Sequence, residues 1–277
     1  MIEQLKFSKM EGLGNDFMVI DAINQSVNLT PALIQKWSHR QFGVGFDQLL
    51  LVEASSKVDF TYRIFNADGS EVEQCGNGAR CFARFVVEKG LTDKSVINVE
   101  TASGIITLYI VDKGLVKVNM GLPNFSPASL PYLTKNTQDI YAIQFDGSEF
   151  KMGLVSMGNP HAILRVNSVE SAPVEKLGSW LESHKDFPER VNVGFAEKVD
   201  NQHLKLRVYE RGAAETLACG TGACAAMVSF RQLGEVGDSV TVSLPGGDLL
   251  IEWSGESNSP VWMSGPATMV FEGVINA

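Results

Sequence analysis

The chain has 277 residues, a length that predicts two domains, and it is 44% hydrophobic and 20% charged, as is usual for a globular protein. Its net charge of −9 argues against a nucleic-acid partner, because phosphate backbones attract basic surfaces. The sequence holds no apolar run of transmembrane length and opens without the apolar core of a signal peptide. We therefore expect a cytoplasmic protein with no membrane partner.

The first half of the chain is predicted to be mostly β-strand, with two helices. A helix should begin at Thr30-Pro31, where a capping residue precedes a proline suited to the first helical position. The main helix should run from about residue 76 to 89 and end before Gly90, since glycine commonly terminates helices. Segments rich in β-branched residues and bounded by Gly or Asp predict strands at 97–99, 105–111 and 115–120.

The second half shows the same succession of elements. A helix is predicted near residues 174–183, and the main helix should run from about residue 220 to 233, ending before Gly234. Strands are predicted to follow at 240–243, 249–253 and 261–263.

The two halves also repeat one residue pattern. The run Cys-Gly-Asn-Gly-Ala at 75–79 matches Cys-Gly-Thr-Gly-Ala at 219–223, an offset of 144 residues. The same offset relates Gly14-Asn15 to Gly158-Asn159, and it slips to 143 further along, where Met120 matches Met263. A nearly constant offset over so long a stretch indicates two copies of one fold, at about residues 8–122 and 152–266.

The predicted fold class is therefore α+β, with two pseudo-symmetric domains. Each domain should be a curved mixed β-sheet around a central helix, because each copy is mostly strand with one long helix. We assign residues 1–122 to the N-terminal domain and 123–266 to the C-terminal domain. The active site is expected in the cleft between them.

Cys75 and Cys219 each directly precede a main helix. Bare amide groups and the helix dipole favour negative charge there, so we expect a lowered thiol pKa and a docking place for a substrate carboxylate. A thiolate on one face of an amino acid could take the α-proton, while a thiol on the opposite face returns a proton and inverts the stereocentre. The pair therefore predicts a cofactor-independent racemase or epimerase.

The other two cysteines fit a structural role. Cys81 and Cys224 lie inside the predicted helices at positions that the repeat does not match, and they should be small buried hydrophobes. The spacings Cys-x5-Cys and Cys-x4-Cys do not suit zinc, so no metal is expected. A thiol redox or metal-binding protein without turnover stays open as an alternative of another class.

Long motifs in both halves resemble those of the diaminopimelate epimerase family. In the first half they are Met10–Phe17, Phe46–Gln48, Phe65–Ser70 and Cys75–Cys81. In the second half they are Met157–His161, Arg190–Asn192, Tyr209–Gly212, Ala218–Cys224 and Leu244–Gly247. The resemblance runs in order along essentially the whole chain.

The resemblance implies interconversion of LL- and meso-diaminopimelate for lysine and peptidoglycan synthesis, without pyridoxal phosphate. It implies that Cys75 and Cys219 are the acid/base pair and that His161 and Glu210 assist catalysis. Most of the implied substrate contacts are amide side chains and helix-start backbones: Asn15, Gln48, Asn66, Gly76, Asn77, Asn159, Asn192, Glu210, Arg211, Gly220 and Thr221. It also implies barrel-like domains, a tail at 267–277 that returns to the first domain, and a homodimer.

The repeat breaks at polar positions, where Glu210 matches Asn66 and His161 matches Phe17. Because diaminopimelate carries a second, unreactive stereocentre, its site cannot be fully symmetric, and we expect the asymmetry at these positions. A proline or hydroxyproline racemase, which shares the two-cysteine chemistry, is the nearest alternative enzyme.

Overall fold

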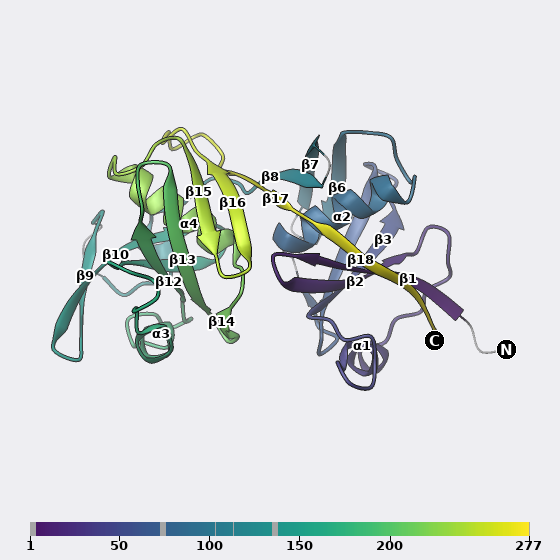
Figure 1. Ribbon diagram of the computed structural model, residues 1–277, viewed down its shortest axis with the longest axis horizontal. Coiled ribbons are helices and arrows are strands. Elements are labelled where there is room, and N and C mark those ends of the chain that lie inside the picture. Colours follow the sequence, from purple (N-terminus) through teal and green to yellow (C-terminus); the bar gives the residue numbers. More distant parts are fainter. Residues whose placement is uncertain (1–3, 73–75, 103, 113, 135–137, 277) are drawn as a thin grey trace. The chain divides into compact units, whose positions relative to one another are not determined.

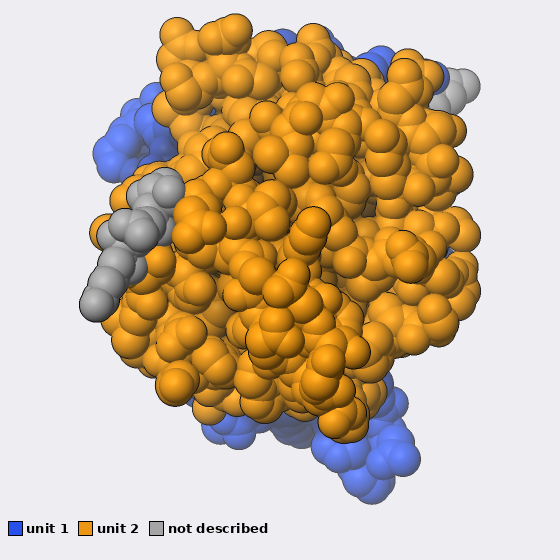
Figure 2. All heavy atoms as spheres, turned by 90° about the vertical axis from the view of Figure 1, so that its left-hand side faces the viewer, with its two compact units in different colours: residues 1–118, 265–277 blue, residues 119–264 orange. Residues whose placement is uncertain are grey.

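The computed structural model describes residues 4–276 except 73–75, 103, 113 and 135–137. By its contacts the chain divides into unit 1, residues 1–118 and 265–277, and unit 2, residues 119–264. Figure 2 colours the two units separately. Within the described ranges, no helix is long and apolar enough to cross a membrane.

Unit 1 is a mixed sheet with two helices (Figure 1). Its helices are α1 (Pro31–Ser38) and α2 (Gly76–Glu88). Its strands are β1 (Gln4–Gly12), β2 (Asn15–Asp21), β3 (Gln48–Ala54), β4 (Phe60–Asn66), β5 (Glu71–Val72), β6 (Val96–Thr101), β7 (Gly104–Asp112), β8 (Leu115–Asn119) and β18 (Thr268–Asn276). Strands β18, β1 and β2 pair antiparallel, β2 is parallel to β3, and β3 is antiparallel to β4. Strand β4 then pairs with β5 and, in parallel, with β6, and β7 and β8 complete the order.

Unit 2 repeats this arrangement. Its helices are η1 (Pro127–Ser129), α3 (Val174–Glu182) and α4 (Gly220–Gln232). Its strands are β9 (Tyr141–Phe145), β10 (Ser148–Ser156), β11 (Pro160–Arg165), β12 (Asn192–Lys198), β13 (His203–Glu210), β14 (Ala214–Thr216), β15 (Ser239–Leu244), β16 (Gly247–Glu252) and β17 (Trp262–Pro266). Strands β10 to β17 pair in the same order and directions as β1 to β8, including the parallel pairs β11–β12 and β13–β15.

The register of the strands follows the repeat closely. Phe17 lies opposite Gln48 in unit 1, and His161 lies opposite Asn192 in unit 2, each at the predicted offset. One strand is supplied differently: β9 pairs with β10 as β18 pairs with β1, although β18 follows unit 2 in the sequence. The predicted α+β class with two pseudo-symmetric parts is confirmed.

Each long helix packs against the strands of its own unit. Helix α4 contacts strands β10, β11, β12, β13, β15 and β16, and its residues are buried almost all round. Small residues make this possible: a Cβ on Gly153 of β10 would lie 1.9 Å from the Ser229 hydroxyl of α4. The large side chains Met227 and Phe230 are buried as well, each contributing about 1.5–3 kcal/mol.

The helix ends follow the predicted chemistry. Thr30 accepts a hydrogen bond from the Leu33 amide at 3.2 Å, which caps α1. Gly90 and Gly234 follow α2 and α4 with φ of 65° and 70°, a left-handed conformation that glycine adopts without strain. Both long helices begin at the first glycine of the repeated cysteine motif, Gly76 in α2 and Gly220 in α4.

Candidate active site

In unit 2, Cys219 occupies the N-cap position of α4 in an extended conformation and is only 4% exposed. Its thiol donates a hydrogen bond to Oε2 of Glu210, at the end of β13, with an Sγ–O distance of 3.0 Å. The other carboxylate oxygen of Glu210 accepts from the hydroxyl of Thr216 in β14. Two strands and the start of a helix thus converge on one thiol.

Burial raises the pKa of Cys219 well above its ordinary value, and the charge of Glu210 and the hydrogen bond to it act in the same direction. The Thr221 hydroxyl and the Gly222 amide lower the pKa, but they do not outweigh these effects. The expectation of a lowered pKa is therefore wrong for Cys219. The helix end alone favours a thiolate, whereas burial of the sulfur and the half-buried carboxylate next to it keep the thiol protonated.

The second glycine of the cysteine motif is required by close packing. A Cβ on Gly222 would lie 3.3 Å from Sγ of Cys219 and 3.1 Å from a methyl group of Val208. A larger residue there would therefore press on the thiol and on Val208.

His161 and Asn159 extend the network from the thiol. Asn159 donates from Nδ2 to the hydroxyl of Thr221 at 3.3 Å, and Thr221 lies 3.6 Å from Sγ of Cys219. Oδ1 of Asn159 therefore accepts from Nε2 of His161 at 3.0 Å, which assigns the proton of the neutral ring to Nε2. Burial, and next the charge of Arg211, lower the pKa of His161 to about 3, so the ring is neutral. Nδ1 of His161 is buried and has no hydrogen-bond partner among the described residues.

Asn192 begins β12, the strand beside His161, and Arg211 lies in the turn between β13 and β14. Asn192 is buried at the start of β12, where its side chain donates to the carbonyl of Pro160 at 2.9 Å and accepts from the Arg211 amide at 3.0 Å. The Arg211 side chain is exposed and donates to the carbonyl of Glu189 at 3.2 Å. Unit 2 thus brings all its predicted site residues together: Asn159, His161, Asn192, Glu210, Arg211, Cys219, Gly220 and Thr221.

In unit 1, Cys75 lies outside the described residues, but its neighbours Gly76 and Asn77 form the start of α2. Nδ2 of Asn77 lies 3.5 Å from Oδ1 of Asn15, and Gln48 donates to Oδ1 of Asn66 at 3.0 Å. Two buried amide oxygens, Oε1 of Gln48 and Oδ1 of Asn77, have no hydrogen-bond partner in the described part of the chain. They are acceptors that an ammonium group could satisfy.

Sequence reasoning missed two residues that support this site. Asp47 accepts from Nδ2 of Asn15 at 3.0 Å, and Thr216 donates to Glu210. Asp47 stands inside the Phe46–Gln48 motif, and Thr216 corresponds to Val72 in the repeat. The polar-for-apolar comparison that singled out His161 would therefore also have found Thr216.

Comparison with solved structures supports the fold. A phenazine biosynthesis protein of the PhzF family from Bacillus anthracis aligns with a TM-score of 0.71 and 18% identity over 99% of both chains. A hydroxyproline epimerase from Agrobacterium vitis aligns with a TM-score of 0.69 and 15% identity over 98% of this chain and 92% of that one. At such identities the likeness concerns the fold alone.

Sequence relatives are much more similar. Diaminopimelate epimerase of Nitrosomonas europaea is 56% identical over 99% of both chains, and that of Thioalkalivibrio sulfidiphilus is 55% identical over 99% of both. The family profile described as diaminopimelate epimerase matches residues 7–126 and 153–270. The chain therefore belongs to the diaminopimelate epimerase family.

Proposed function

We propose that this protein interconverts LL- and meso-diaminopimelate by a two-base mechanism that uses Cys75 and Cys219 and no pyridoxal phosphate. The observation that carries the proposal is the thiol of Cys219, which is buried at the start of α4 and donates a hydrogen bond to Glu210. Family membership supports the choice of substrate, since the relatives at 55–56% identity are named for it.

These two residues account for both protons that move in the reaction. The thiolate of Cys75 takes the α-proton from one face of the substrate, and the thiol of Cys219 gives a proton to the opposite face. The electron pair left on the α-carbon is delocalised into the carboxylate, which the bare amides of the helix starts stabilise. After turnover Cys75 is a thiol and Cys219 a thiolate. For the reverse direction that state is the starting point.

Glu210 controls the proton on Cys219. Its carboxylate orients the Sγ–H bond and disfavours the thiolate, so Cys219 stays protonated and holds the proton that it gives as the acid. When Cys219 must act as the base, the same carboxylate is within 3.0 Å of the sulfur and can take the thiol proton. His161, neutral and held by Asn159, is assigned to support this end of the site.

The substrate-binding residues divide by chemistry. The buried acceptors Gln48 and Asn77 suit an ammonium group, and Arg211 suits a carboxylate. The backbones at Gly76-Asn77 and Gly220-Thr221 are assigned to the reacting carboxylate. Asn15, Asn66, Asn159 and Asn192 complete the proposed set.

Incubation of the purified protein with LL-diaminopimelate in deuterated water tests the proposal. Proton NMR should show loss of the α-proton signal and formation of the meso isomer carrying deuterium at the inverted centre. Unchanged substrate would refute the proposal. Proline and trans-4-hydroxyproline serve as control substrates, and turnover of either in place of diaminopimelate would favour the racemase alternative.

Two finer assignments accompany this function. We propose that the protein is a cytoplasmic homodimer, as its family resemblance implies, with a small molecule as its substrate. Light scattering of the purified protein measures the oligomeric state directly, and a monomer would contradict this assignment.

A further inference from the structure

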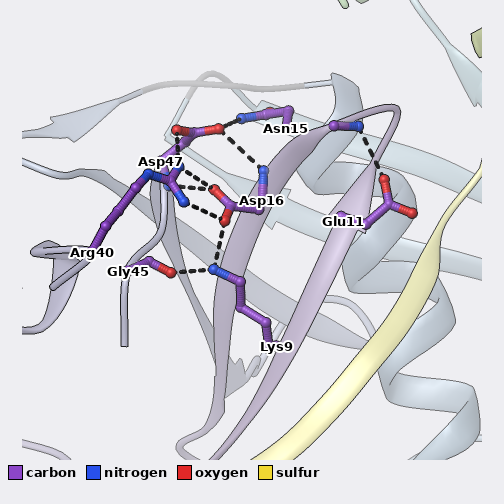
Figure 3. A network of polar contacts seen from close by, with 8 residues as sticks. Lys9, Glu11, Asn15, Asp16, Arg40, Gly45 and Asp47 are labelled. Atoms are coloured by element: carbon purple, nitrogen blue, oxygen red, sulfur yellow. Dashed lines mark hydrogen bonds and ion pairs between the residues drawn. The ribbon is translucent and has the colours of Figure 1, made fainter. Parts of the chain in front are cut away.

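Two asparagines at equivalent positions of the repeat are held in different ways. In unit 2, Asn159 is fixed by His161 and Thr221. In unit 1, Asn15 is fixed by Asp47, at 3.0 Å, within a group of charged side chains drawn in Figure 3. The counterpart of Asp47 in the repeat is Val191, so this support belongs to unit 1 alone.

The charged side chains, Lys9, Asp16, Arg40 and Asp47, form what we call the charge cluster. Arg40 donates from both terminal nitrogens to the two carboxylate oxygens of Asp16, each at 2.9 Å, and also to Oδ1 of Asp47 at 2.8 Å. Lys9 donates to Asp16 at 2.6 Å and to the carbonyl of Gly45. The backbone amides of Asp16 and Asp47 donate to each other's side chains at 3.2 and 2.9 Å. Asp47 is therefore held from three directions.

Asp16, at the centre of the charge cluster, stays ionised across the ordinary pH range. Burial acts to raise the pKa of Asp16, but the hydrogen bonds and charges of Arg40 and Lys9 outweigh burial and lower it to about 2. The two carboxylates are matched by two cations, so the cluster is neutral as a whole. Because its net charge is zero, the cluster neither attracts nor repels a charged substrate, but its hydrogen bonds hold the four side chains in fixed positions.

Asp47 determines which way the Asn15 amide faces. An ionised carboxylate only accepts hydrogen bonds, so the nitrogen of the amide must point to Asp47. The oxygen of Asn15 then turns toward the start of α2, where Nδ2 of Asn77 lies 3.5 Å away. Without the carboxylate, the amide could rotate by half a turn and present a donor there instead.

We propose that Asp47 is a positioning residue for Asn15: held by Arg40 and Asp16, it keeps an acceptor oxygen directed at the start of α2. This inference rests on the proposed function, in which Asn15 and the start of α2 contact the substrate. Asp47 itself is assigned no contact with the substrate.

A double-mutant cycle tests whether Asp47 acts through Asn15. Asp47→Asn keeps the shape and removes the charge, and it should lower kcat/KM by about 10- to 100-fold, as expected for a misplaced contact. In an Asn15→Ala background the same change should have no further effect. Losses that multiply independently in the double variant would overturn the proposal. Asp59→Asn removes the carboxylate of an ion pair with Lys94 elsewhere in unit 1, and it should leave kcat/KM unchanged.

A second variant guards against loss of folding. Arg40 is largely exposed, and Arg40→Lys keeps the positive charge while losing the fork that spans Asp16 and Asp47. It should lower kcat/KM by a smaller factor, in the same direction. Full activity in Arg40→Lys and in Asp47→Asn would each contradict the role of the cluster.

Side-chain NMR separates this inference from the proposed function. The Nδ2 protons of Asn15 should shift and exchange faster with solvent in Asp47→Asn than in the wild type. An unchanged Asn15 signal would sink the positioning role even in an active epimerase. A wild-type protein that fails to epimerise diaminopimelate would refute the proposed function and leave the NMR result to stand alone.

Discussion

Replacing His161 with phenylalanine should remove a pH-dependent contribution to the stability of the protein. Phenylalanine is the residue that the repeat itself uses at this place, since Phe17 faces Gln48 as His161 faces Asn192. His161 is fully buried and has a pKa of about 3, whereas an unfolded chain holds histidine near its ordinary value of about 6.5. Between these values the unfolded state binds a proton that the folded state does not.

The sign and size follow from proton linkage. Stability falls as the pH falls from about 6.5 toward 3, by about 1.4 kcal/mol for each pH unit. At about pH 4.5 the wild type should have lost about 3 kcal/mol from this group relative to about pH 7.5. His161→Phe should not suffer this loss. It leaves Oδ1 of Asn159 unpaired, but that cost, about 1–3 kcal/mol, is the same at both pH values.

Urea unfolding of both proteins at the two pH values measures the difference. The free energy of unfolding of the wild type should drop by about 3 kcal/mol more than that of His161→Phe. His39 is exposed after α1, and His39→Phe should behave as the wild type does. Parallel losses in the wild type and in His161→Phe would show that His161 is not a buried neutral group, and the reasoning would fail.

Three further outcomes follow from the site. Cys75→Ala and Cys219→Ala should each abolish epimerisation with retained folding, and an intact rate in either, measured by NMR, would exclude the two-base scheme. Glu210→Gln removes a carboxylate that raises the pKa of Cys219, so iodoacetamide should label Cys219 faster while epimerisation slows; slower labelling, followed by peptide mass spectrometry, would contradict this. Gly222→Ala presses on the Cys219 sulfur, so kcat should fall by at least about tenfold with a melting temperature only a few degrees lower; equal kcat would mean that the thiol has room to move.

The sequence predicts the local structure well where local chemistry decides it. Helix α1 begins at the predicted Thr30-Pro31 pair, and α2 and α4 begin and end within one residue of their predicted places. The capping residue, the proline and the terminal glycines each determine the backbone within about one turn of the helix. The repeat carries the prediction further, to strand register. The offset of the repeat changes from 144 to 143 residues in the short connection between Gly90 and β6 and in its counterpart in unit 2.

The electrostatics of the site are not local, and the sequence predicts them poorly. The start of α4 favours a thiolate at Cys219, but burial removes water from the sulfur and Glu210 reaches it from β13. The support of Asn15 is assembled from β1, β2 and the segment after α1, three stretches with no shared pattern. Such groups become visible only once the strands have been placed side by side.

The position of β18 has a consequence for the order in which the protein can form on the ribosome. In register, Gln4 lies opposite Asn276, so the first strand of unit 1 waits for a partner that is translated after all of unit 2. Unit 2 is continuous in sequence and takes its matching strand, β9, from the residues directly before β10. The usual sequence of events, in which the N-terminal part folds first during synthesis, is therefore inverted. Until β18 arrives, the nascent chain carries an open β1 edge, which is where a chaperone or a second nascent chain would pair with it.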